Sequence, residues 1–312
     1  MTDQTAGKPV DTRTVLGPLE LRTPVITASG TFGYGQEYAG LADFSRVGAV
    51  TTKGITLEPR PGNPDPRICE TPSGMLNAIG LENPGVEAFV TGKLPWLAER
   101  GVPVIANING ITVEEYATLA ARLDGCPGLV AVEVNISCPN VEHGGMEFGR
   151  DPTMTERVVW AVRAATTLPL VVKLSPNVTS IVDIARAAVA GGADILSLIN
   201  TLLGMSIDIA RRRPHIARGT AGLSGPAIRP VAVRMVWEVH RALPEAPLIG
   251  MGGIMTGADA IEFILAGASA VGVGTANFVN PNAAGEVLDD MIRYAERVGA
   301  ASIAELVGAL RL

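Results

Sequence analysis

The chain has 312 residues, of which 47% are hydrophobic and 18% are charged, with 36 glycines and 22 prolines. This composition supports a large core with many turns and excludes a disordered, collagen-like or coiled-coil protein. Because the net charge is −6 and the longest basic run is Arg211-Arg212-Arg213, which reads as a solvated turn, binding to the phosphate backbone of nucleic acid is not expected.

The start of the chain and the cysteines predict a cytoplasmic setting. Residues 1–14 are polar and contain no apolar segment of a secretory signal or membrane anchor. Cys69, Cys126 and Cys138 are too few and too scattered for a disulfide framework, which favours a reducing compartment. Residues 263–285 are uncharged but interrupted by glycine, asparagine and proline, so we expect a helix end and a buried strand there rather than a membrane span.

Eight short apolar segments recur along the chain, with amphipathic helical patterns between them. Their near-continuous apolarity is typical of strands buried on both faces of a parallel sheet. Capping patterns indicate that one helix begins near Thr112 and another near Ser180. The predicted strands are 24–28, 49–53, 104–108, 130–135, 170–173, 195–199, 247–250 and 270–274.

The spacing of these segments predicts an α/β fold, a (β/α)8 TIM barrel in a single domain. Most gaps fit one strand–helix unit, whereas those from 49 to 104 and from 195 to 247 are about twice as long, which indicates insertions after strands 2 and 6. We expect an N-terminal extension (1–23), a barrel core (24–280) and C-terminal helices (281–312).

A doubly wound sheet is the alternative architecture, and it would normally carry a glycine-rich dinucleotide fingerprint after its first strand. The glycines at 30, 33 and 35 do not have that spacing, and Asn277 replaces the third glycine after the last strand. The sequence therefore predicts no NAD site in this chain.

Polar residues collect where the predicted strands end, which is where TIM barrels carry their active sites. Paired carboxylates are absent there, so a glycosidase is not expected. His143, His215 and His240 are isolated, so no metal site is expected either. Amides both donate and accept hydrogen bonds and therefore suit a flat heterocycle with carbonyl and ring N–H groups. The polar strand-end residues are Ser29, Thr52, Lys53, Asn107, Asn135, Cys138, Lys173, Asn200 and Thr201.

Glycines at the ends of strands seven and eight, around Gly252-Gly253 and Gly274-Thr275, leave backbone N–H groups free to bind a phosphate. Tight turns alone would also explain these glycines. The lysines at two other strand ends favour the phosphate interpretation.

Cys138 and the two lysines each allow a functional and a structural interpretation. A thiol on the glycine-rich loop that follows strand four could act as base or nucleophile, but a lone cysteine is also a common packing residue, as we expect for Cys69 and Cys126. The position of Lys53 and Lys173 at strand ends inside the barrel favours a functional role, although a salt bridge to Glu133 could hold one of them.

Seven segments of the chain together resemble class 1 dihydroorotate dehydrogenases. The likeness covers nearly the whole chain, and Leu223-Ser224-Gly225-Pro226 favours the NAD-linked class 1B branch. Asn109 departs from the pattern, because relatives commonly have a small apolar residue there. The segments are NISCPN at 135–140, TKG at 52–54, GMLNAIGL at 74–81, KLSPN at 173–177, INT at 199–201, GLSGPAI at 222–228 and GMGG at 250–253.

The resemblance implies an FMN-dependent enzyme that oxidises (S)-dihydroorotate to orotate in pyrimidine synthesis. Cys138 would remove the C5 proton while hydride passes from C6 to FMN. The implied substrate contacts are Lys53, Asn77, Ala78, Ile79, Gly80, Leu81, Asn135, Asn200 and Thr201. The implied FMN contacts are Ser29, Thr52, Lys53, Asn107, Asn135, Lys173, Ile199, Gly225, Gly252, Gly253, Gly274 and Thr275.

The resemblance also implies a partner subunit. Three cysteines cannot supply the four thiolates that an iron–sulfur cluster takes, and the dinucleotide fingerprint is missing. FAD, a [2Fe-2S] cluster and the NAD+ site would therefore lie on an electron-transfer subunit, in a heterotetramer built around a homodimer of catalytic subunits. No membrane or nucleic-acid partner is expected.

Other functions stay open at this point. A fumarate-using homodimer of class 1A type, or a related FMN dihydropyrimidine oxidoreductase, would share most of these residues. A phosphate-binding lyase or aldolase would use Lys173 as a Schiff-base lysine. A non-catalytic scaffold would leave Cys138 and both lysines without a role.

Overall fold

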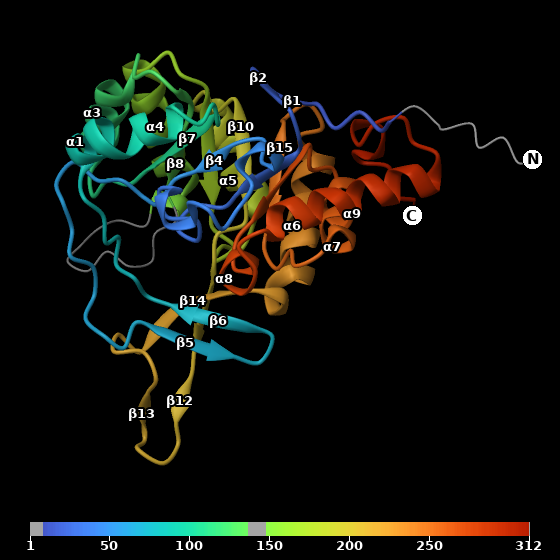
Figure 1. Cartoon of the computed structure of the whole chain (residues 1–312). Helices are drawn as coiled ribbons and strands as arrows, with labels where there is room; N and C mark the ends of the chain where they lie inside the picture. Colours follow the sequence, from blue (N-terminus) through green and yellow to red (C-terminus); the bar gives the residue numbers. More distant parts are fainter. Residues whose placement is uncertain (1–8, 137–147, 312) are drawn as a thin grey trace, which may run out of the picture.

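The computed structural model describes residues 9–136 and 148–311, and a closed barrel of eight parallel strands forms the centre of this part of the chain (Figure 1). Each predicted apolar segment overlaps one barrel strand, so the TIM-barrel prediction is confirmed. The barrel strands are β3 (Val25–Thr27), β4 (Val50–Thr51), β7 (Val104–Ile108), β8 (Leu129–Asn135), β9 (Leu170–Leu174), β10 (Ile195–Leu198), β15 (Leu248–Met251) and β16 (Ala270–Val273).

Helices follow the strands and cover the outside of the barrel. Two predicted starts are confirmed, because the Thr112 and Ser180 hydroxyls accept hydrogen bonds from the N–H groups of Glu115 and Asp183. No helix in residues 9–136 and 148–311 combines the length and apolarity needed to cross a bilayer. The α-helices are α1 (Val86–Ala88), α2 (Leu94–Ala98), α3 (Val113–Leu123), α4 (Pro152–Ala165), α5 (Ile181–Ala190), α6 (Arg229–Ala242), α7 (Gly257–Leu265), α8 (Ala276–Val279) and α9 (Ala283–Val298), with a π-helical turn at Phe89–Lys93 and 3₁₀ turns at Gln36–Tyr38, Phe44–Arg46, Phe148–Arg150, Pro226–Ile228 and Ala304–Leu306.

The inside of the barrel changes from apolar to polar along the strands. Ile105, Ala131 and Val171 belong to a buried apolar cluster that fills one end of the barrel. Because side chains alternate along a strand, the residues two positions further on also face inward. These are Asn107, Glu133 and Lys173, all buried. The barrel therefore has an apolar floor and a polar upper layer.

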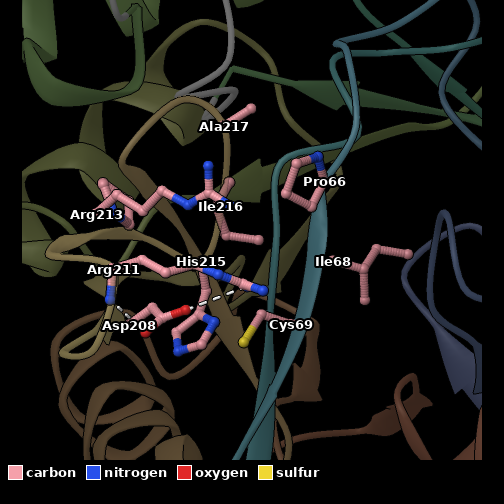
Figure 2. A pocket seen from close by; sticks show the side chains of 10 residues that line it. Pro66, Ile68, Cys69, Asp208, Arg211, Arg213, His215, Ile216 and Ala217 are labelled. Atoms are coloured by element: carbon pink, nitrogen blue, oxygen red, sulfur yellow. Dashed lines mark hydrogen bonds and ion pairs between the residues drawn. The ribbon is translucent and has the colours of Figure 1, made fainter.

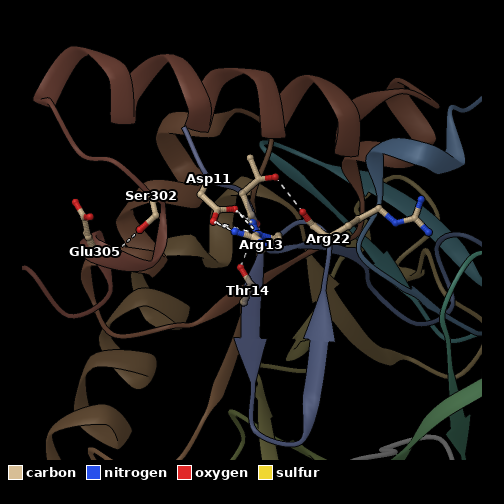
Figure 3. Close-up of polar contacts among 7 residues, drawn as sticks. Asp11, Arg13, Thr14, Arg22, Ser302 and Glu305 are labelled. Atoms are coloured by element: carbon tan, nitrogen blue, oxygen red, sulfur yellow. Dashed lines mark hydrogen bonds and ion pairs between the residues drawn. The ribbon is translucent and has the colours of Figure 1, made fainter. Parts of the chain in front are cut away.

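The segment around Asp11 lies beside the segment around Ser302 (Figure 3). A hairpin of β1 (Thr14–Leu16) and β2 (Leu19–Leu21) places its leucines in the apolar cluster. Just before it, the Asp11 N–H donates to the Ala301 carbonyl at 2.9 Å and the Asp11 carbonyl accepts from the Ile303 N–H at 3.2 Å. Hydrogen bonds from the Arg13 side chain lower the pKa of the Asp11 carboxyl to about 2. The β1–β2 hairpin thus covers the end of the barrel that carries no polar layer.

The two insertions combine into a single antiparallel sheet, ordered β11, β14, β6, β5. The first insertion supplies β5 (Ile68–Thr71) and β6 (Gly74–Asn77), and the second supplies β11 (Leu202–Met205) and β14 (Thr220–Ser224). A short hairpin of β12 (Ile207–Asp208) and β13 (Arg213–Pro214) extends beyond this sheet (Figure 1). The predicted positions of the insertions are confirmed, but their pairing with each other was not predicted.

Candidate functional site

A cavity of about 200 Å³ lies between the polar ends of the barrel strands and the four-stranded sheet. Half of the residues that the sequence singled out meet there, although they come from distant parts of the chain. The barrel contributes Ser29, Lys53, Asn107, Asn135, Asn200 and Thr201. The strand β6 and the loop after it contribute Asn77, Ile79, Gly80 and Leu81.

Lys173, on β9, brings a positive charge into the barrel. Its side chain is only 4% exposed, and its ammonium donates to the Ser29 hydroxyl at 3.0 Å. Within residues 9–136 and 148–311, no carboxylate lies within 4.0 Å of it. Since a buried cation is unfavourable unless it is paired, an anionic group is the natural complement of Lys173.

The expectation that a salt bridge joins Glu133 to Lys53 or Lys173 is wrong. The Glu133 carboxylate accepts from the Asn107 amide at 2.6 Å and from the Ser197 hydroxyl at 2.8 Å. Lys53 instead lies 4.0 Å from a Glu82 carboxylate oxygen that is 2.6 Å from the Arg67 guanidinium. The Lys53 ammonium is thus only loosely paired and lines the cavity.

Three amides are fixed around the cavity by their own contacts. The Asn200 amide donates to the Asn135 side-chain oxygen at 3.3 Å and its oxygen accepts from the Thr201 N–H at 2.8 Å. The Asn77 amide donates to the Gly222 carbonyl at 3.4 Å, across the β6–β14 pair. Amides held in defined directions can recognise the carbonyl and N–H edge of a heterocycle.

The predicted phosphate loops converge beside the cavity. A Cβ on Gly253 would lie 2.7 Å from the Gly225 carbonyl oxygen, so these two loops are in contact and only glycine fits. The Thr275 hydroxyl donates to the Ser224 hydroxyl at 2.9 Å, which joins the loop after β16 to the same point. Ser224 itself lines the cavity.

The loop after β15 is held by one carboxylate from α7. The Asp259 side chain accepts from the backbone N–H groups of Met255 and Thr256, both at 2.9 Å, and pairs with the Arg229 guanidinium. A capping box with Thr256 fixes the start of the helix. This arrangement holds the loop that contains Gly252 and Gly253.

Some predicted site residues do not line the cavity. Ala78 is fully buried in a small apolar cluster beneath β6. The Thr52 hydroxyl accepts from the Asn107 N–H at 3.2 Å, and the Ile199 N–H donates to the Met251 carbonyl at 3.0 Å. These residues support the cavity wall. Lys173, Gly225, Gly252, Gly253, Gly274 and Thr275 also lie outside the lining set.

Other lining residues were missed. Gly54, Met75 and Ser224 stand in the quoted motifs, whereas nothing in the local sequence marked Ile68 or Phe278, which come from the first insertion and from α8. The missed lining residues are Gly30, Thr31, Gly54, Ile68, Met75, Ser224 and Phe278.

Cys138, the predicted base, lies in the stretch 137–147, outside the described residues. The other cysteines have ordinary surroundings. Cys126 is half-buried and packs against the main core, and Cys69 packs against the small cluster below β6.

A second pocket, of about 590 Å³, lies between β5 and the β12–β13 hairpin (Figure 2). Arg211, predicted to lie in a solvated turn, pairs there with Asp208 at 3.3 Å. The pocket contains none of the residues predicted for the site. Although it is larger than the barrel cavity, its charged side chains lie on exposed chain, so we place the site at the barrel mouth.

Comparisons with known proteins identify the family of the chain. The family model for dihydroorotate dehydrogenase matches residues 12–294. The chain is 59% identical to a protein of Pelobacter propionicus over 95% of this chain and 97% of that one. It is 60% identical to a protein of Desulforudis audaxviator over 96% of this chain and 97% of that one. Both relatives are described as "Dihydroorotate dehydrogenase B (NAD(+)), catalytic subunit".

A solved structure shows the same fold at lower identity. The crystal structure of the Eimeria tenella dihydroorotate dehydrogenase in complex with ferulenol superposes with a TM-score of 0.81, at 23% identity, and covers 96% of this chain and 88% of that chain. The family model and the two close relatives extend over almost the whole sequence. The chain therefore belongs to the dihydroorotate dehydrogenase family.

Proposed function

We propose that the chain is the catalytic subunit of an NAD+-linked dihydroorotate dehydrogenase, an oxidoreductase that converts (S)-dihydroorotate to orotate in pyrimidine synthesis. The relatives' descriptions support this reaction. The single observation that carries it is the buried ammonium of Lys173 in the polar layer of the barrel, for which the Ser29 hydroxyl is the one hydrogen-bond partner among the described residues. A redox site in which negative charge develops on a bound ring would supply the missing anion.

The residues present fit FMN. The contact between Gly253 and Gly225 leaves a bare backbone surface of the kind that phosphate groups approach. Asn107 and Lys173 lie where the ring system would reach the polar layer of the barrel. The proposed FMN contacts are Ser29, Thr52, Lys53, Asn107, Asn135, Lys173, Ile199, Gly225, Gly252, Gly253, Gly274 and Thr275.

The pyrimidine would occupy the cavity on the side of the inserted sheet. Lys53 would bind the carboxylate of dihydroorotate, and the amides of Asn77, Asn135 and Asn200 would bind its ring carbonyl and N–H groups. Thr201 and the backbone of residues 78–81 would complete the proposed contact set. This arrangement would hold C5 and C6 of the ring in one orientation.

Cys138 would act as the base. A free thiol titrates near about 8.5, so a small downward shift next to a cation would let it accept the C5 proton near neutral pH. When bound, FMN supplies the acceptor for the hydride that leaves C6. The protein's part is to align the ring, hold the thiolate and exclude water.

The electrons would leave through another polypeptide. The relatives' description as a "catalytic subunit" supports the existence of a partner. We propose that this partner carries FAD and a [2Fe-2S] cluster, in a cytoplasmic heterotetramer around a homodimer of this chain. Within the chain we propose one FMN-binding domain, with residues 1–23 as extension, 24–280 as barrel core and 281–312 as C-terminal segment.

An anaerobic visible spectrum tests the proposed function. The purified chain loaded with FMN should be yellow, bleach with dihydroorotate, and stay bleached with NAD+ or fumarate until the partner subunit and NAD+ are supplied together. Recovery with fumarate alone would indicate a class 1A-like enzyme. Bleaching by dihydrouracil but not by dihydroorotate would indicate a different dihydropyrimidine. A chain that cannot be loaded with FMN would overturn the proposal.

Two glycine variants test the proposed phosphate site. Gly253→Ala should abolish FMN binding and lower stability, because φ is +81° and the new Cβ would lie 2.7 Å from the Gly225 oxygen. Gly274→Ala should fold normally, since its Cβ would meet nothing closer than 3.5 Å, yet it should weaken FMN binding. Gly92→Ala, which meets no atom within 4 Å, is the control in flavin titrations. If Gly274→Ala binds FMN with wild-type affinity, the proposal that the phosphate binds beside Gly274 is wrong.

A further inference from the structure

A chain of hydrogen bonds crosses the polar layer of the barrel, below the cavity. The Asn109 amide donates to the Asn107 side-chain oxygen at 2.9 Å, and the Asn107 amide donates to Glu133 at 2.6 Å. From the other side, the Ser197 hydroxyl donates to the second oxygen of Glu133 at 2.8 Å. These four residues come from β7, its following turn, β8 and β10, and none is more than 1% exposed.

Glu133 determines the direction of this chain. A carboxylate offers only acceptors, so Asn107 must turn its NH₂ group toward Glu133 and its oxygen toward Asn109. Asn109 must then donate, and its own buried oxygen is left without a hydrogen-bond partner among the described residues. The network therefore holds Asn107 in one orientation, although the Asn109 oxygen has no hydrogen-bond partner among the described residues.

Packing does not explain a carboxylate at this position. The interior of a TIM barrel is usually filled by branched apolar residues, as one layer below in this chain. In residues 9–136 and 148–311, no cation lies within 4.0 Å of Glu133. The Lys173 ammonium donates to Ser29 and not to Glu133. An apolar residue of similar size would avoid burying this carboxylate. Among the described residues, the evident role of Glu133 is to accept hydrogen bonds from Asn107 and Ser197.

We propose that Glu133 is a positioning residue for FMN, which acts by locking the amide of Asn107. Asn107 lines the cavity, so its orientation decides which hydrogen-bonding groups the bound ring meets. An Asn107 amide free to turn over would present its oxygen in place of N–H for part of the time and bind the ring less well. This inference rests on the proposed function, since it takes FMN as the ligand.

The test compares two replacements of Glu133 in the FMN-loaded full chain. In Glu133→Leu the acceptor is lost, and we expect FMN to bind about tenfold more weakly, with a shifted visible absorption maximum. The unfolding temperature should fall, because the buried donors of Asn107 and Ser197 lose their acceptor. In Glu133→Gln the new oxygen can still accept from Asn107 while the new NH₂ group donates to Ser197, whose hydroxyl can accept. Glu133→Gln should therefore restore wild-type FMN affinity and spectrum.

A double-mutant cycle separates positioning from structure. Asn107→Leu alone should weaken FMN binding, and adding Glu133→Leu should weaken it no further, because Glu133 acts only through Asn107. Additive losses would overturn the inference, as would wild-type affinity in Glu133→Leu. If Glu133→Leu does not fold, Glu133→Met, whose flexible thioether adapts to irregular space, replaces it in the same cycle.

The outcomes distinguish this inference from the proposed function. A loss in Glu133→Gln as large as in Glu133→Leu would show that the charge itself matters, and would overturn the positioning role while leaving FMN as the cofactor. A wild-type chain that binds no FMN would overturn both.

Discussion

Cys138→Ala is expected to bind FMN like the wild type and to oxidise dihydroorotate about 10² to 10⁴ times more slowly at pH 7, the usual contribution of a general base. The remaining steps, ring binding and hydride acceptance, do not use the thiol. Stopped-flow bleaching of the flavin by dihydroorotate measures this step directly, because it does not depend on the partner subunit.

Two further cysteine variants make this result specific. Cys138→Ser should retain weak activity that rises with pH, because a hydroxyl is a far weaker acid than a thiol and is deprotonated only in strongly alkaline solution. Cys126→Ala should bleach at the wild-type rate, since Cys126 packs in the core away from the cavity. Normal bleaching in Cys138→Ala would exclude the thiol as the base.

Lys173→Met is expected to move stability and activity in opposite directions. Lys173 is 4% exposed and has no anionic partner in the part of the chain that the structure describes, so removing its ammonium should leave the free energy of unfolding unchanged or raise it by about 1 kcal/mol or more. Turnover should fall by about 10² to 10³, the usual loss when one preorganised charge-stabilising group is deleted. Urea unfolding of the flavin-free chain and flavin bleaching of the loaded chain measure the two effects.

Lys93→Met is the matched control, because Lys93 donates to Gln36 at 2.6 Å and lies outside the cavity lining. It should leave the bleaching rate unchanged. If Lys173→Met unfolded more easily than the wild type and still bleached normally, Lys173 would have only a structural role. Trapping of a substrate on Lys173 by borohydride would instead support the lyase alternative.

The sequence was sufficient to predict the barrel because its strands are buried on both faces. Segments such as 104–108 and 170–173 carry an almost unbroken apolar signal, and the helices between them begin at hydroxyl caps such as Thr112. The polar residues at the strand ends then converge because parallel strands in a barrel all end on the same side. Fold and site position therefore followed from local patterns.

The contacts between distant segments could not be predicted in this way. Nothing near Glu133 indicates that Asn107 and Ser197, rather than a lysine, are its partners, because all three lie on different strands. The pairing of the two insertions was missed for the same reason. Strand pairing depends on backbone hydrogen bonds that many sequences can form, so Ile68, which β5 contributes to the cavity lining, carried no local signal.

The sheet made from the two insertions also has a consequence for the order of folding. Asn77 and Gly222, which face each other in it, are 145 residues apart in the chain, and the strands from β7 to β10 lie between them. The entropy of closing so long a loop is offset only once the barrel has brought the two insertions together. A newly made chain should thus complete its barrel first and acquire a ligand-binding cavity only afterwards.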